Sequence, residues 1–412
     1  MIRLTTTQLQ PIGLDIGADS IKMLQLETSG ESLSVHVAAR LPIPEEARMS
    51  DELRMPIAVD LIRQMFRQNA FSGRNVIATL PRGILHVKNL RLPMMPPAEL
   101  QAAIEFEARS VFPFSTDDAH VCYLDAGEVR QGTDAKQEVV VLAAQNQDVD
   151  AFLEQLHRCG AVVESLDWEP AALYRGIERF IRRREDEHEV HVLVDVGLRC
   201  SQVVIGKGRE ISFYKPIDIA GQKFNEAVSR KLGISMEEAS ALRRRLGENP
   251  TPNDEAAKSD PVRQAVYDST RSLMEELARE ISLCLRYYSV TFRGHRPNRV
   301  RLVGGEGNDA QLQMLLNAAL PIPVETGRLM QSLNLNQLKP ADRRGSLAEW
   351  SVALGLGLKQ TKGRFGSRDG TPRAAASAEI PLASQAEVID LNHAINRGAP
   401  AAEAPKPEVA NA

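Results

Sequence analysis

The 412-residue sequence has few cysteines and no long apolar run. Its cysteines, Cys122, Cys159, Cys200 and Cys284, are scattered and show neither metal-ligand spacing nor a disulfide framework. Nowhere are about 18 consecutive residues apolar, and the first residues, MIRLTTTQLQ, lack the apolar core of a signal peptide. We therefore expect a cytoplasmic protein of a reducing compartment, which reaches the inner face of a membrane only through a partner.

Several catalytic signatures are also missing. The eight histidines show no HxxxH or HExxH spacing, which argues against a zinc site. No GxSxG elbow marks a serine hydrolase, and no Walker A motif marks a P-loop protein. The net charge of −4 and the pI near 6.1 argue against nucleic acid as the main partner.

Two similar runs of strands are present instead. PIGLDIG, SIKMLQLE and LSVHVAARLPI predict a three-stranded meander near the N-terminus. HVLVDVG, CSQVVIGKG and EISFYKPIDI repeat this pattern about 180 residues later, which indicates two duplicated lobes. We expect a first lobe at 10–185 with an insert at about 90–160, a second lobe at 186–340, and a closing helix at 341–360 that returns to the first lobe.

The spacing of apolar residues predicts the intervening helices. They are expected at 60–69, 98–110, 149–159, 172–184, 221–246, 262–290, 310–320 and 347–359. The segment 361–412 is rich in Ala and Pro and predicts a disordered tail. Within it, EVIDLNHAINR at 387–397 is either a segment that folds on binding or a chance apolar patch.

The turn after the first strand has the composition of a phosphate site. Glycine lets backbone N–H groups approach a phosphate chain closely, and a lysine adds positive charge. Asp15, at the strand end, can hold the water ligands of a phosphate-bound Mg²⁺. The predicted phosphate-binding residues of this turn are Gly17, Ala18, Asp19, Ser20 and Lys22.

Two further glycine turns complete the predicted site. Asp195 and Gly197 repeat the Asp-x-Gly turn in the second lobe, and Asp195 is a second candidate for holding Mg²⁺ through water. Gly304, Gly305 and Glu306 follow the strand RVRLV, where a flat base or ribose can lie against the backbone. Each turn alone is commonplace, but their order predicts a nucleotide clamped between two lobes.

Longer segments resemble one family, the PilM proteins of bacterial type IV pilus assembly. The resemblance covers roughly residues 10–360. It rests on LRLPMMPPAELQAAIEFEARSVFPF, AGQKFNEAVSRKLGISMEEASALRRRLG, REISLCLRYYSV and VALGLGLK. It implies the α/β fold of actin-like ATPases such as FtsA, with two duplicated ribonuclease H-like lobes and a small αβ insert in the first.

The resemblance also implies ligands and partners. It implies ATP or ADP with Mg²⁺ in the cleft between the lobes, and places Gly221, Lys223 and Arg243 near the base or ribose. It implies docking of the N-terminal peptide of a PilN-like inner-membrane protein on the first lobe and its insert. Further expected contacts are other assembly and motor components, and self-association. Ala18, Asp19 and Ser240 depart from the family pattern, which bears on nucleotide affinity.

Other functions remain open from the sequence. A small-molecule kinase of the same fold needs a catalytic base, and no residue can be nominated for that role, so we expect at most weak ATPase activity. A filament-forming actin-like protein is a second alternative, against which the insert argues. A type II secretion protein resembling PilM would continue into a transmembrane segment, which the sequence lacks.

Overall fold

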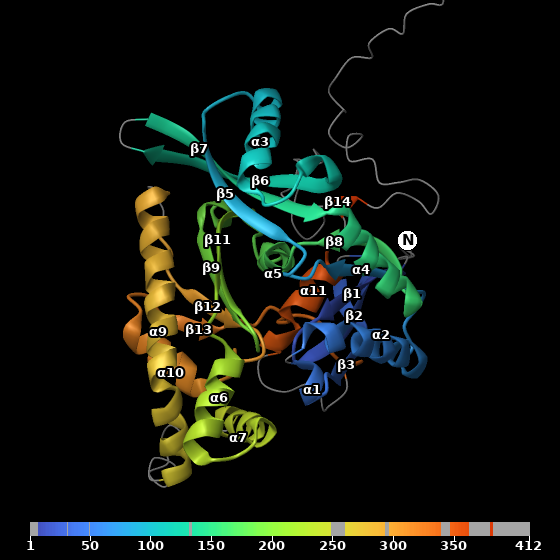
Figure 1. Cartoon of the computed structure of the whole chain (residues 1–412), viewed down its shortest axis with the longest axis vertical. Coiled ribbons are helices and arrows are strands. Elements are labelled where there is room, and N and C mark those ends of the chain that lie inside the picture. The colour runs from blue at the N-terminus through green and yellow to red at the C-terminus, as the bar shows by residue number, and fades with distance from the viewer. Residues whose placement is uncertain are drawn as a thin grey trace, which may run out of the picture.

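The computed structural model describes residues 7–30, 32–48, 50–131, 134–248, 260–292, 296–338, 347–361 and 380–381. The segment 387–397 and nearly all of the expected tail lie outside these residues. Within the described part of the chain, no helix combines the length and apolarity needed to cross a membrane. Figure 1 shows the arrangement of the elements.

The first sheet begins with the meander expected near the N-terminus. Its strands are β1 Thr7–Ile16, β2 Ser20–Ser29, β3 Ser32–Pro42, β4 Asn75–Thr79, β8 Val162–Asp167 and β14 Ile380–Pro381, in the order β14-β8-β4-β1-β2-β3. β1, β2 and β3 are antiparallel, whereas β4 runs parallel to β1 and β8. Apolar side chains of β1, β4 and β8 pack against the helices α2 Asp51–Gln68 and α4 Asn146–Arg158, and the short helix α1 Glu45–Arg48 follows β3.

The second sheet repeats this plan. Its strands are β9 Val190–Val196, β10 Ser201–Lys207, β11 Glu210–Ile217, β12 Val300–Val303 and β13 Val324–Thr326, in the order β11-β10-β9-β12-β13. Again three antiparallel strands are followed by two parallel ones. The helices of this part are α6 Gly221–Leu232, α7 Met236–Glu248, α9 Pro261–Thr291 and α10 Ala310–Ala319.

A third, smaller sheet lies between β4 and β8 in the chain. It consists of β5 His86–Pro93, β6 Ala119–Gln131 and β7 Asp134–Gln145, in the order β5-β7-β6, and α3 Pro97–Val111 packs on it. The helix expected at 98–110 is α3, whereas β5 was not predicted from the sequence. Lys88, Asn89 and Arg91 of β5 are exposed, so this edge strand lacks the apolar alternation of a buried strand.

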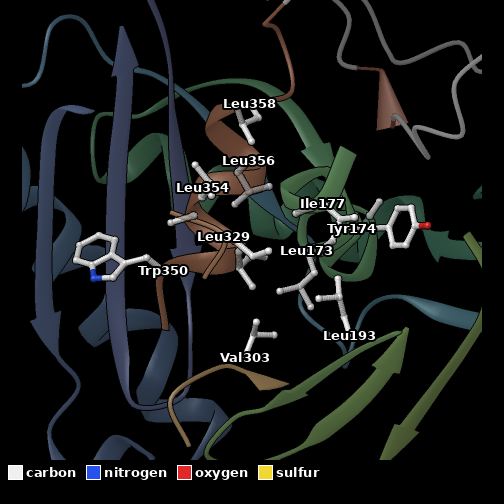
Figure 2. Close-up of a cluster of buried hydrophobic side chains, with 14 of the residues drawn as sticks. Leu173, Tyr174, Ile177, Leu193, Val303, Leu329, Trp350, Leu354, Leu356 and Leu358 are labelled. Atoms are coloured by element: carbon white, nitrogen blue, oxygen red, sulfur yellow. The ribbon is translucent and has the colours of Figure 1, made fainter. Parts of the chain in front are cut away.

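One apolar cluster joins the first and second sheets. It contains side chains of α5 Glu169–Glu178, α11 Ser351–Gly357 and both sheets. Figure 2 shows Leu354 and Leu356 of α11 in this cluster, with Leu173 and Ile177 of α5 and with Leu193 and Val303 of the second sheet nearby. A Cβ at Gly355 would overlap the carbonyl oxygen of Ala172 in α5, so the small-residue run of α11 permits backbone contact between the two helices.

Three predicted helices differ in extent, and the first of them, expected at 60–69, begins earlier, at Asp51. The expected helix 172–184 ends at Glu178, because the Asp186 carboxylate accepts from the backbone N–H groups of Arg182 and Arg183. The helices expected over 221–246 are α6 and α7, which are separated at Gly233, whose φ of 67° ends α6. The closing helix 347–359 is a 3₁₀ turn at Ala348–Trp350 followed by α11.

Candidate functional site

Asp15 and Lys22 form a buried ion pair at the first glycine turn. They are partners in the register of β1 and β2, and Lys22 Nζ lies 3.1 Å from Asp15 Oδ2. Burial raises the pKa of Asp15 more than the charge of Lys22 lowers it. Burial lowers the pKa of Lys22, but the charges of Asp15 and Glu349, together with the hydrogen bond to Asp15, hold it above its usual value. The lysine is thus directed to the aspartate of the turn.

Asp19 is surrounded by three arginines. Its carboxylate lies 3.1 Å from Arg40, 3.3 Å from Arg48 and 3.2 Å from Arg244. Burial would raise the pKa of Asp19, but the charges of these arginines lower it. A carboxylate at this turn would repel phosphates, and the arginines, with a smaller effect of Lys22, compensate its charge. Because Arg244 belongs to α7, its ion pair with Asp19 joins the first glycine turn to a helix that follows the second sheet's meander.

Asp195 lies at the corresponding place in the second sheet, near the end of β9. Gln202, its partner in the register of β10, donates to Asp195 Oδ2 at 2.7 Å. Burial, followed by the negative charge of Glu169, raises the pKa of Asp195 to about 7. Asp15 adds to the rise. The ends of β1 and β9 therefore bring negative charge together inside the protein.

The third glycine turn packs directly on Asp195. Gly304 has φ 90°, and a Cβ there would overlap Asp195 Oδ1. Gly305 is exposed, and a Cβ there would meet no heavy atom within 4 Å. The structure therefore leaves open space at the second glycine, as a flat group lying against the backbone would require.

Arg243 ties this turn to α6. Its guanidinium lies 2.6 Å from Glu306 Oε2 and 3.3 Å from Asp309 Oδ2, and it donates to Asn225 at 2.7 Å. It also donates to the carbonyl oxygen of Gly221. Through these contacts, the buried Arg243 holds the Gly304 turn in place against α6.

The remaining predicted residues surround the start of α6. The N–H of Gly221 donates to Gly197 O at 3.0 Å, which holds the second glycine turn against the helix. Lys223 is exposed on the first turn of α6. Ser201, at the start of β10, is buried and donates to the carbonyl oxygen of Ile219.

Sequence reasoning missed three polar residues next to Asp195. Glu169, the first residue of α5, accepts from Arg82 Nε at 3.2 Å and from Gln202 Nε2 at 3.0 Å. These residues come from three distant segments, and only the fold brings them together. An acidic residue in the first turn of a helix was the one available signal, but it is common for reasons of helix stability alone.

A cavity of about 540 Å³ adjoins this group. Its walls come from the segment 80–89, the start of α5 and the strand β11, so it lies where the first sheet, the insert and the second sheet meet. Trp168 and Tyr214 form an edge-to-face pair in the wall, with ring centroids 4.9 Å apart. The polar wall residues include Arg82, Lys88, Glu169 and Asp218. The volume is within the usual range of ligand pockets, roughly 300–1,000 Å³.

The residues of the cleft fit a magnesium nucleotide. Asp15, Asp195 and Glu169 concentrate negative charge that a divalent cation would neutralise. In the described part of the chain, no group of three or more His, Cys, Asp or Glu residues could hold a metal ion. Coordination through water and phosphate oxygens, which Mg²⁺ favours, suits this arrangement better than a protein cage.

The two sheets of equal plan, joined by α5 and α11 with glycine turns at their strand ends, define an actin-like fold. The family model described as type IV pilus assembly protein PilM matches residues 13–361. The chain therefore belongs to the PilM family, as the resemblance in sequence indicated.

The fold is also similar to that of solved structures. The chain is similar to one described as the PilM-PilN type IV pilus biogenesis complex, with a TM-score of 0.69 and 21% identity, covering 85% of this chain and 98% of the other. Another match is the ethanolamine utilization protein EutJ from Carboxydothermus hydrogenoformans, with a TM-score of 0.48, 12% identity and coverage of 85% and 89%.

Proposed function

We propose that this PilM-family protein is a nucleotide-binding adaptor of type IV pilus assembly. Its cleft would hold ATP or ADP with Mg²⁺, and its first lobe and insert would dock the N-terminal peptide of a PilN-like inner-membrane protein. The observation that carries the proposal is that Asp15 and Asp195 lie at equivalent strand ends of the two sheets. The open space at Gly305, in the third glycine turn, supports it. The similarity to a solved PilM-PilN complex supports the partner.

In this proposal, each turn has a separate task at the nucleotide. The amides of residues 17–20 cradle phosphates, and Asp15 and Asp195 hold the water ligands of Mg²⁺, which neutralises the phosphates when bound. Gly305 leaves room for the nucleoside, with Lys223 at the rim of the cleft. Glu169 already accepts from Arg82 and Gln202 and is therefore not held free to activate water, so we expect at most slow hydrolysis.

The cavity is the proposed docking site for the peptide. Among the described strands, β5 pairs with β7 only, so its other edge offers backbone groups to an added strand. Val87, Lys88 and Asn89 of this strand line the cavity. The aromatic pair Trp168 and Tyr214 supplies apolar surface for side chains of an extended peptide.

An adaptor of this kind is held at the inner face of the membrane by its partner. We assign the lobes to residues 10–185 and 186–340, with the segment 341–360 returning to the first lobe. Contacts with other assembly and motor components, and self-association, belong to the same proposal.

The central experiment measures binding of a synthetic PilN N-terminal peptide to the full chain with and without Mg-ATP. Asn89→Trp, which fills the cavity from an exposed edge, should abolish binding, whereas Gln147→Trp on the exposed face of α4 should not change it. Absence of peptide binding in both states would rule out the docking function. Rapid phosphotransfer to small substrates would instead favour the kinase alternative.

A further inference from the structure

A short chain of polar contacts links the cavity to the cleft. Arg82, in the cavity wall, lies 3.2 Å from Glu169, and Gln202 donates to Glu169 at 3.0 Å through the same amide nitrogen that donates to Asp195 at 2.7 Å. Three consecutive contacts therefore lead from a wall of the proposed peptide site to an aspartate of the proposed nucleotide site.

The backbone around these residues is fixed. Gln202 is fully buried on β10 and pairs with Asp195 in the sheet. Glu169 begins α5, and its neighbours Trp168 and Pro170 also line the cavity. The N–H of Leu80, a further wall residue, donates to the carbonyl oxygen of Asp167 at 3.0 Å. A peptide in the cavity would therefore contact the same helix turn that presents Glu169 to the cleft.

We infer that the contacts from Arg82 through Glu169 and Gln202 to Asp195 couple the two sites, so that each ligand tightens the binding of the other. The inference rests on the proposed function and adds a regulatory connection to it. Arg82 and Gln202 are positioning residues in this scheme, because they act on the nucleotide through Glu169 and Asp195.

The sign of the coupling follows from electrostatics and ordering. Arg82 is partly exposed, so water screens its ion pair with Glu169. A peptide that fills the cavity excludes this water, strengthens the ion pair and fixes the Glu169 carboxylate, which in turn fixes the Gln202 amide against Asp195. The second ligand then meets a site that is already ordered, which gives positive and reciprocal coupling.

Lys88 provides a matched control. It is a second cation in the cavity wall, but it lies on the exposed strand β5 and does not contact Glu169 or Gln202. Lys88→Gln and Arg82→Gln therefore remove the same charge from the same cavity, and only the second interrupts the contacts. Gln202→Met conserves the approximate side-chain volume and removes the amide without altering the cavity wall.

The test is the dissociation constant of Mg-ADP for the full chain, measured by calorimetry with and without saturating PilN N-terminal peptide. In the wild type, the peptide should lower this constant by about fivefold or more. In Arg82→Gln and Gln202→Met the ratio should be close to one, and in Lys88→Gln it should stay at the wild-type value. Thermal melts of each variant confirm that it is folded, and Arg82→Lys, which keeps the charge, should give an intermediate ratio.

The outcomes separate the two ideas. If the wild type binds neither ligand, or only one, the proposed function fails and the coupling fails with it. If it binds both, but the peptide weakens nucleotide binding or leaves it within twofold, the coupling is overturned and the function stands. Loss of the ratio in Lys88→Gln as well would show that cavity charge, and not this chain of contacts, links the sites.

Discussion

Titration of Asp195 tests the cleft most directly. Burial and the charge of Glu169 raise the pKa of Asp195 from an ordinary value near 3.8 to about 7. The ionised form, which would hold the waters of Mg²⁺, is then roughly a tenth of the population at pH 6 and about nine tenths at pH 8. We expect the affinity for Mg-ADP to rise about tenfold over this range.

The same shift affects the unligated protein in the opposite sense. Since the pKa of Asp195 is higher in the folded than in the unfolded state, the folded state binds the proton more tightly, and stability falls as the pH rises from about 4 to about 7. Three pKa units correspond to at most ~4 kcal/mol. Asp195→Asn should remove this loss, so that the variant is more stable than the wild type at pH 8 although it binds nucleotide less well.

The assay is calorimetric titration of Mg-ADP at pH 6, 7 and 8, with thermal melts of both unligated proteins. The terminal phosphate of the nucleotide also titrates, with a pKa of about 6, so the difference between wild type and Asp195→Asn isolates the contribution of the protein. Parallel affinity profiles for the two proteins would refute the placement of Asp195 beside the metal and phosphates. Equal stability of the wild type and Asp195→Asn at pH 8 would refute the raised pKa of the buried Asp195 carboxylate.

The remaining predictions concern three other positions. Arg243→Met leaves two carboxylates without their buried cation, which should cost about 3–5 kcal/mol and lower the Tm by about 10 °C; a drop under 2 °C in a thermal melt would contradict the role of Arg243 in holding the Gly304 turn. Arg244→Ala removes the ion pair with Asp19, which is worth up to ~1 kcal/mol. The rate of nucleotide release, measured by stopped flow, should therefore increase up to about fivefold. The control Arg230→Ala, on α6, should leave this rate unchanged. Gly304→Ala places an alanine in a left-handed backbone conformation and brings its Cβ against Asp195, which costs at least ~1–2 kcal/mol. The substitution should weaken ADP binding in calorimetric titration. Unaltered affinity would disprove the close contact.

The sequence predicted the two meanders because each strand carries a buried alternation or a continuous apolar run. It also predicted the three glycine turns, since Asp15 and Asp195 lie near the ends of apolar strands and Gly304 directly follows one. These are local patterns, and the fold retains them. The strand β5 escaped notice because its exposed edge carries Lys88 and Asn89, so its sequence resembles a loop.

Ion pairs and hydrogen bonds between residues far apart in the chain could not be predicted from the sequence. Nothing in the spacing indicates that Asp19 would be neutralised by arginines of α1, β3 and α7, or that Lys22 would pair with Asp15. The same holds for the contacts of Glu169. It lies about 90 residues after Arg82 in the sequence and about 30 residues before Gln202. Their contact depends on how the ends of β4 and β8 meet the beginning of β10, which is a property of the assembled sheets.

The core shared by the two sheets limits how a nucleotide could act on a partner. Because α5 and α11 touch through Gly355 and bury side chains from both sheets, the lobes cannot slide over one another without exposing this core. A rotation about these helices would alter the Asp19–Arg244 distance. The cavity has one wall on the first turn of α5 and another on β11, so such a rotation would also change its width. A peptide in the cavity and a nucleotide in the cleft would thus respond to the same motion.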